Sequence, residues 1–136
     1  HPDIGSEAAV RAAVRAAAGI GYSTGPSGVH LTKLFERWGI AQEIKDRIVQ
    51  AKPGVPVGSM VADGTIALGF QQKSELMNLS GIDVLGPLPP AIQVLTTFSA
   101  GIAATSAQPD AARALCAFLA SPGTAPIKQR NGMEPA

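Results

Sequence analysis

The sequence is poor in the residues that several classes of function require. Cys116 is the only cysteine among 136 residues, which excludes an intrachain disulfide and a metal site built from several cysteines. Charged residues make up 15% of the chain, and 11 basic against 10 acidic residues leave a net charge of +1. This balance excludes the basic stripe that binds nucleic acid and the polybasic cluster that binds membrane surfaces.

Long apolar runs and aromatic residues are also scarce. No apolar run reaches the roughly 18 residues that span a bilayer, and aromatic residues are 4% of the chain. The length of 136 residues predicts one domain, and the 46% hydrophobic content supplies its core, mainly as Ala, Val, Ile and Leu. The chain begins at His1 rather than Met, and it has no signal-peptide pattern. We expect a processed or excised piece of a longer protein.

The pattern of apolar residues and of Gly and Pro predicts helices that alternate with short strands. This alternation is typical of α/β architecture with a mixed or parallel sheet. Helices are expected at 6–18, 29–38, 42–51, 57–62, 109–119 and 125–130, and strands or extended segments at 20–23, 65–70, 83–87 and 92–105.

The loop 23–28, Ser-Thr-Gly-Pro-Ser-Gly, joins the first predicted strand to a helix. Backbone N–H groups at a helix start, together with the hydroxyls of Ser23, Thr24 and Ser27, form a site for a small oxyanion or carboxylate without arginine. The alternative is an ordinary helix start that Ser27 caps. No Lys-Ser/Thr pair follows the glycines, and their spacing does not match the dinucleotide-binding motif.

Two further polar segments are expected beside this loop. The loop 53–59, Pro-Gly-Val-Pro-Val-Gly-Ser, leads into a helix, and Gln71-Gln72 ends an apolar strand. Ligands of open α/β sheets bind beyond the carboxyl ends of the strands, where the loop 23–28 and Gln71-Gln72 are expected. The alternatives are a plain turn and solvated amides. All three segments lack charged residues, which favours an anion-binding site formed by uncharged groups.

Signals for catalysis are weak. His30 follows Ser27 by three residues, but no acid that could orient the imidazole lies nearby in the sequence. We therefore expect a surface or packing histidine, with no catalytic residue, no metal and no cofactor.

Four segments, 19–40, 61–76, 81–93 and 98–122, together resemble the molybdate-binding-type family of bacterial solute-binding proteins. The resemblance covers 2–135 and implies a type II periplasmic-binding fold whose first lobe is absent. It implies that an inserted second lobe, a mixed sheet flanked by helices, occupies 20–95. A helix at 1–19 leads into this lobe, and a return strand and helices follow at 96–136.

The resemblance also implies a function and a ligand site. The function is the periplasmic, extracytoplasmic component of an ABC importer, which binds a small oxyanion or carboxylate and delivers it to a permease. The alternative is a periplasmic isomerase of a small organic acid, with His30 or Glu75 as the base. The implied ligand contacts are Pro26, Ser27 and Gly28, then Gly54 or Val55, and then Gln72, where family members often have tyrosine.

The C-terminal segment is predicted to associate. Leu115, Phe118 and Leu119 recur at helical spacing, and an unpaired strand edge is expected before them. The resemblance implies that this segment packs on the lobe that is absent here. Left bare, both features favour pairing, which predicts a homodimer or a domain-swapped dimer. The alternative is that the segment folds back on its own lobe.

Overall fold

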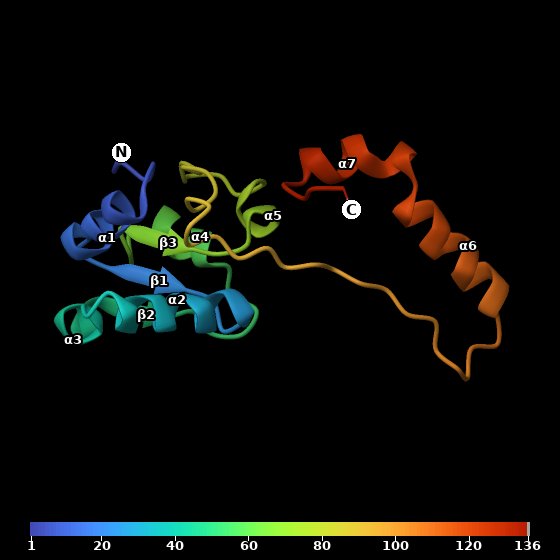
Figure 1. Ribbon diagram of the computed structural model, residues 1–136, viewed down its shortest axis with the longest axis horizontal. Coiled ribbons are helices and arrows are strands. Elements are labelled where there is room, and N and C mark those ends of the chain that lie inside the picture. Colours follow the sequence, from blue (N-terminus) through green and yellow to red (C-terminus); the bar gives the residue numbers. More distant parts are fainter. Residues whose placement is uncertain (136) are drawn as a thin grey trace. The chain divides into compact units, whose positions relative to one another are not determined.

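The protein is described by a computed structural model over residues 1–135. It divides into two compact units, His1–Val94 and Leu95–Ala136. Figure 1 shows their elements. The first unit contains α1 (Glu7–Ala16), β1 (Ile20–Tyr22), α2 (Pro26–Arg37), α3 (Ala41–Ile44), the 3-10 turn η1 (Lys45–Arg47), β2 (Ile48–Gln50), α4 (Val57–Ala62), β3 (Leu68–Phe70) and α5 (Lys73–Leu76). The second contains α6 (Pro109–Ala120), the 3-10 turn η2 (Pro122–Thr124) and α7 (Ala125–Arg130).

Helix α1 forms where its sequence predicts it. The Ser6 hydroxyl accepts a hydrogen bond from the Ala9 N–H at 3.1 Å and so caps the helix start. Val10 and Val14, four residues apart, are buried on one face of the helix. The chain then passes through Gly19 into the central strand β1.

Within residues 1–135 the strands form one parallel sheet in the order β2-β1-β3. The α/β class is confirmed, although the sheet is parallel where a mixed sheet was expected for this lobe. In the register, Ile20 lies opposite Ile48 on one side and opposite Leu68 on the other. The helix predicted at 42–51 is wrong in its second half, because β2 begins at Ile48. Ile48 and Val49 are β-branched and have the edge of β1 to pair with, which favours a strand.

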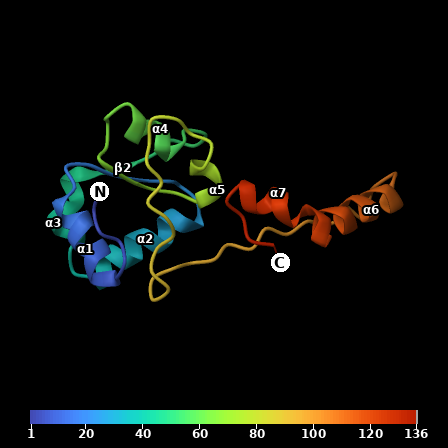
Figure 2. The same ribbon diagram turned by 90° about the horizontal axis from the view of Figure 1, so that it is seen from above.

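The two faces of the sheet pack against different helices. One core joins α1 and α2 to strand residues that include Ile20, and a second core joins α4 to Ile66. A Cβ atom at Gly69 would lie 2.9 Å from the side chains of Val57 and Val61. A glycine there lets α4 approach the sheet closely. Helices α1 and α2 cover one side of the sheet and α4 the other (Figure 2).

The segment between α5 and α6 contains no helix or strand. The strand predicted at 83–87 is therefore wrong, and the expected extended segment at 92–105 has no strand pairing. Prolines at positions 87, 89 and 90 lack the N–H groups that a strand ladder needs. Ile92 is buried in the core of α1 and α2 and holds this end of the first unit.

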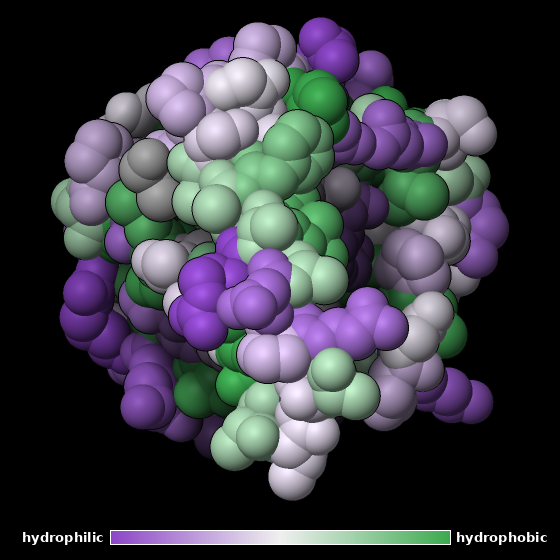
Figure 3. Space-filling model, turned by 90° about the vertical axis from the view of Figure 1, so that its right-hand side faces the viewer, coloured by the Kyte–Doolittle hydropathy of each residue, from purple (hydrophilic) through white to green (hydrophobic). Residues whose placement is uncertain are grey.

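The second unit has almost no interior of its own. Helix α6 has no buried residue over its described length, whereas Thr124 is buried and its hydroxyl donates to the carbonyl oxygens of Leu119 and Ser121. Large apolar side chains are exposed in this unit, including Leu95, Phe98, Leu115 and Phe118. Figure 3 shows one face of the protein, where apolar residues in green reach the surface among polar residues in purple. In the described chain, no helix has the length and apolar character needed to cross a membrane.

Candidate functional site

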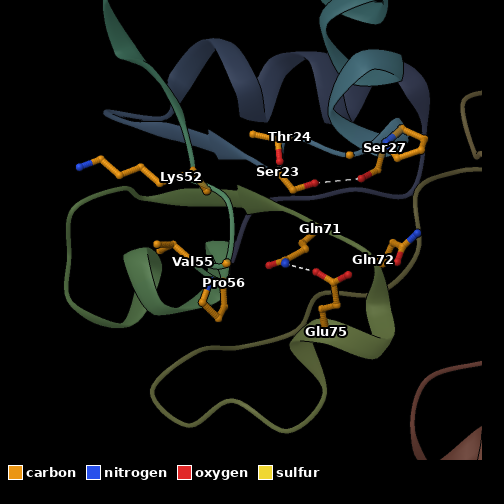
Figure 4. Close-up of a pocket in the computed structure, with 13 residues that line it drawn as sticks. Ser23, Thr24, Ser27, Lys52, Val55, Pro56, Gln71, Gln72 and Glu75 are labelled. Carbon is orange, nitrogen blue, oxygen red and sulfur yellow. Dashed lines mark hydrogen bonds between the residues drawn. The ribbon is translucent and has the colours of Figure 1, made fainter.

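The residues that follow the three strands line one pocket of about 540 Å³ (Figure 4). Residues 23–27 reach it from the end of β1, and residues from 51–56 reach it from the end of β2. Gln71, Gln72 and Glu75 reach it from the end of β3. Parallel strands place their carboxyl ends at the same edge of the sheet, so the three loops meet there.

The strand order explains why a pocket forms at this edge. β1 is central, and the chain goes from β1 to β2 through α2 and from β2 to β3 through α4. Because α2 and α4 cover opposite faces of the sheet, the loops after β1 and β2 diverge. A crevice at such a switch point is the usual ligand site of open α/β sheets.

The loop after β1 is shorter than the sequence predicts. Helix α2 begins at Pro26, not Val29, with Gly25 as its N-cap. Proline suits the first helical position, because its fixed φ is helical and its missing N–H needs no partner there. Ser27 therefore lies in the first turn of the helix. Its Oγ lies 3.1 Å from that of Ser23, and within 1–135 no backbone acceptor takes the Ser27 N–H.

Gly28 is buried and does not line the pocket. Its N–H donates to the Gly25 carbonyl oxygen at 3.0 Å. A Cβ atom here would overlap the Ser23 carbonyl oxygen and would lie 2.8 Å from the Tyr22 ring. The observed role of Gly28 is to let α2 pack against the end of β1.

The loop after β2 contains a tight turn. The Val55 N–H donates to the Lys52 carbonyl oxygen at 3.0 Å, and Gly54 has φ +81°. Pro53 followed by a glycine with positive φ is the signature of a type II turn. Gly54 and Val55, two predicted contacts, both line the pocket together with Lys52.

The loop after β3 links two parts of the pocket. Gln71 Oε1 accepts the Val57 N–H at 2.7 Å, at the start of α4. Gln71 Nε2 donates to Glu75 Oε2. Gln72 is the N-cap residue of α5, makes no side-chain cap bond, and lines the pocket.

Two charged side chains overturn the expectation of a neutral pocket. Lys52 and Glu75 both belong to its wall. Gln71, which was expected only as part of the Gln71-Gln72 segment, also lines the pocket. The spacing of Gln71 and Glu75, four residues apart beyond a strand end, is the signal that could have drawn attention to this pair.

The two candidate bases lie in different places. Glu75 lines the pocket, whereas His30 does not. The imidazole Nε2 of His30 lies 3.1 Å from the Ile92 carbonyl oxygen, so His30 holds the end of the first unit against α2.

Shifted pKa values occur outside the pocket. Hydrogen bonds from the Trp38 indole and the Arg37 guanidinium lower the pKa of Glu7. A hydrogen bond from Arg15 lowers the pKa of Glu43 in the same way. These carboxylates tie α1 to the ends of α2 and α3, so they serve the scaffold around the site.

Comparison with known proteins identifies the family. The family model for bacterial extracellular solute-binding proteins matches residues 2–134. Aconitate isomerase from Pseudomonas sp. is 38% identical over 137 residues, which cover 98% of this chain and 51% of that protein. The chain thus spans about half the length of this relative. No solved structure matches. The expected kinship with bacterial solute-binding proteins is confirmed, and the chain belongs to the bacterial extracellular solute-binding protein family.

Proposed function

We propose that this pocket forms one wall of a cleft that binds a small oxyanion or carboxylate for import. The observation that supports it is the convergence of three strand ends on a pocket that contains the Ser23 and Ser27 hydroxyls and the first turn of α2. Family membership supports a binding role outside the cytoplasm, and we propose the periplasm as its location.

The physical argument concerns the cost of desolvating an anion. Helix α2 has 12 residues, and the positive end of its dipole favours an anion at its first turn. The Ser27 N–H and the serine hydroxyls provide donors that replace water. Lys52 lies in the same wall and adds a positive charge, but its ammonium group is not held in a specific geometry toward the ligand.

The proposed ligand contacts are Pro26, Ser27, Gly54 or Val55, and Gln72. We further propose a type II fold in which 20–95 is one lobe, 1–19 leads into it and 96–136 returns. A second lobe then provides the facing wall, and closure of the two lobes presents the bound ligand to an ABC permease. Kinship with the molybdate-binding type stays a prediction of the resemblance.

A titration of the 136-residue chain followed by amide NMR tests the site. Sulfate, molybdate and succinate are expected to shift the amide signals of 23–25, Ser27, 54–55 and 71–72, with weak, millimolar affinity. Each charge-assisted hydrogen bond that the facing wall would add is worth about 1.5–3 kcal/mol, and about 1.4 kcal/mol corresponds to tenfold in affinity. Submicromolar binding would contradict the one-wall arrangement.

A matched pair of variants locates the site. Ser27→Leu is expected to abolish the shifts, because the larger side chain fills the space in front of the first turn of α2. Ser80→Leu makes the same change at an exposed position outside the pocket, and is expected to bind as the parent does. Equal affinity in all three proteins would remove Ser27 from the site.

A second candidate function is isomerisation of a small unsaturated acid. Two observations favour it: the relative is named aconitate isomerase, and Glu75, one of two candidate bases, lines the pocket. In such a reaction the Glu75 carboxylate takes a proton from the carbon next to a C=C bond. The double bond moves by one position, and the Glu75 carboxyl group, whose proton exchanges with solvent, returns one proton to the far carbon, so no co-reactant is needed.

Proton NMR of aconitate in D2O separates turnover from binding. An isomerase changes the ratio of cis and trans isomers and incorporates deuterium, and Glu75→Gln abolishes both. Binding without either change supports the solute-binding function instead. Turnover that Glu75→Gln retains would show that Glu75 is not the base.

We also propose that the exposed face of α6 mediates a homodimer or a domain-swapped dimer. Leu115, Phe118 and Leu119 are exposed along this helix, and covering them would bury apolar surface. Light scattering at high concentration is expected to give twice the monomer mass of 13.9 kDa. A monomer mass at high concentration would contradict the dimer.

A further inference from the structure

The carboxylate of Glu75 is held in the pocket wall by a chain of two hydrogen bonds. Val57 is buried, and its N–H donates to Gln71 Oε1 at 2.7 Å. Because this bond commits the carbonyl end of the Gln71 amide, its NH2 end is left to donate to Glu75 Oε2. Reversing the amide would oppose two donors at Val57, which leaves a buried N–H without an acceptor, and two acceptors at Glu75, which is costly.

The negative charge of Glu75 has no cationic partner in the pocket. Among the ion pairs of residues 1–135, neither Glu75 nor Lys52 takes part in one. The Lys52 side chain extends away from Gln71 and Glu75 (Figure 4). No described side chain or backbone group other than Gln71 donates to this carboxylate, so Glu75 Oε1 is available to a ligand.

The pocket therefore has two chemically different sides. The hydroxyls of Ser23 and Ser27 lie on one side, and the Gln71–Glu75 pair lies on the other (Figure 4). The hydroxyl side can donate to an anionic group, whereas the Glu75 carboxylate accepts only. A ligand that satisfies both sides needs an acceptor at one end and a donor at the other.

We infer that the ligand is a small organic acid that carries a hydrogen-bond donor, a hydroxyl or an ammonium group, beside its carboxylate. This inference rests on the proposed function and narrows it. A tetrahedral dianion such as sulfate or molybdate offers acceptors alone and is repelled by Glu75. The Glu75 carboxylate thus acts as the specificity-determining group of this wall.

Three four-carbon diacids provide matched probes: succinate without a donor, malate with a hydroxyl, and aspartate with an ammonium group. Sulfate serves as the inorganic oxyanion. Each is titrated into the 136-residue chain at constant ionic strength and followed by the amide signals of the pocket. Malate or aspartate is expected to bind about three- to tenfold more tightly than succinate, as one hydrogen bond to a charged group in a water-exposed site would give.

Variants assign this preference to Glu75. Glu75→Ala is expected to bind all three diacids alike and to bind sulfate severalfold more tightly than the parent. Glu75→Gln keeps an acceptor without a charge, so it retains a preference for the hydroxyl and loses one for the ammonium group. Glu36→Ala removes the same charge from an exposed position of α2 outside the pocket, and is expected to keep the parent's order of affinities.

The outcomes separate this inference from the function on which it rests. Succinate binding as tightly as malate and aspartate, or sulfate binding most tightly to the parent, overturns the inference and leaves anion binding intact. A preference for malate or aspartate that survives in Glu75→Ala also overturns it. Absence of pocket shifts with all four anions contradicts the proposed function, and the inference with it.

Discussion

Helices α2 and α6 have the same length and the same kind of start, yet they differ completely in burial. Each has 12 residues and a proline in its first turn. Helix α2 buries Leu31, Leu34 and Phe35, whereas α6 buries no residue although its sequence is rich in Ala and Leu. The difference is that α2 has a sheet to pack against in its own unit, and α6 has none.

This comparison shows that apolar content alone does not produce a core. A helix in water gains most of its stability from the surface on which its apolar face packs. The buried apolar residues of the described chain all lie between Val10 and Ile92, within the first unit. The second unit therefore depends for its stability on local helix formation and on whatever covers its exposed apolar face.

Truncation of one phenylalanine in each helix should give the largest contrast. Phe35 is 1% exposed and Phe118 is 60% exposed. Phe35→Ala is expected to lower the free energy of unfolding by about 3–5 kcal/mol, through lost burial and a cavity. Phe118→Ala is expected to change it by less than about 0.5 kcal/mol at concentrations where the chain is monomeric.

Urea denaturation of both variants measures this contrast. A large loss in Phe118→Ala at low concentration would mean that α6 packs within its own chain, which would remove the reason for proposing a dimer. A loss in Phe118→Ala that appears only at high concentration would support the dimer.

A second contrast uses two glycines. A Cβ at Gly28 would overlap the Ser23 carbonyl oxygen, whereas the nearest atom to a Cβ at Gly123 is the Ser121 Oγ at 3.8 Å. Gly28→Ala is expected to cost about 1–3 kcal/mol, because α2 must move away from β1. Gly123→Ala is expected to be nearly neutral. Equal thermal unfolding midpoints for the two variants would show that α2 tolerates displacement.

Elements with strong local signals could be predicted from the sequence. Val57–Ala62 and Ala125–Arg130 form helices over the expected residues, and Ile20–Tyr22 forms the expected strand. Prolines and glycines mark the limits of these elements through backbone geometry. Strand β2 was missed because the preference of Ile48 and Val49 for a strand depends on β1, a partner 28 residues away in the register.

The site was predictable in position but only partly in chemistry. The rule that ligands bind beyond strand ends was applied to the loop 23–28 and to Gln71-Gln72, and both line the pocket. The loop 53–59 was predicted only as a helix start, because the strand before it was missed. Lys52 was not predicted at all, Gln71 was predicted only as part of a polar segment, and Glu75 only as a candidate base. The bond from Val57 to Gln71 joins residues 14 apart, and no local pattern shows that a buried N–H will need that amide.

Helix caps provide a third and smaller contrast between the units. The Ser6 hydroxyl caps α1, whereas Gln108 makes no side-chain cap bond to α6. Ser6→Ala is expected to destabilise the first unit by about 1 kcal/mol, since the Ala9 N–H loses its acceptor. Gln108→Ala is expected to have no measurable effect. Hydrogen exchange at the first turn of each helix is the measurement, and faster exchange after both changes would contradict the contrast.

The smallest expected effect concerns acid pH. Glu7 Oε1 accepts hydrogen bonds at 2.6 Å from both the Trp38 indole and the Arg37 guanidinium, and these bonds lower its pKa. A carboxylate whose folded-state pKa is lowered contributes stability above its unfolded pKa of about 4.3, and this contribution is lost as the pH falls through the folded value. Thermal unfolding of Glu7→Gln between pH 7 and pH 3 is therefore expected to show a lower midpoint than the parent at pH 7 and a smaller fall of the midpoint on acidification.

Asp110→Asn is the matched change in the second unit, where Asp110 lies 3.9 Å from Arg113. This substitution is expected to affect the curve less. A parent and a Glu7→Gln variant with parallel curves would show that the bonds from Trp38 and Arg37 do not stabilise the ionised carboxylate.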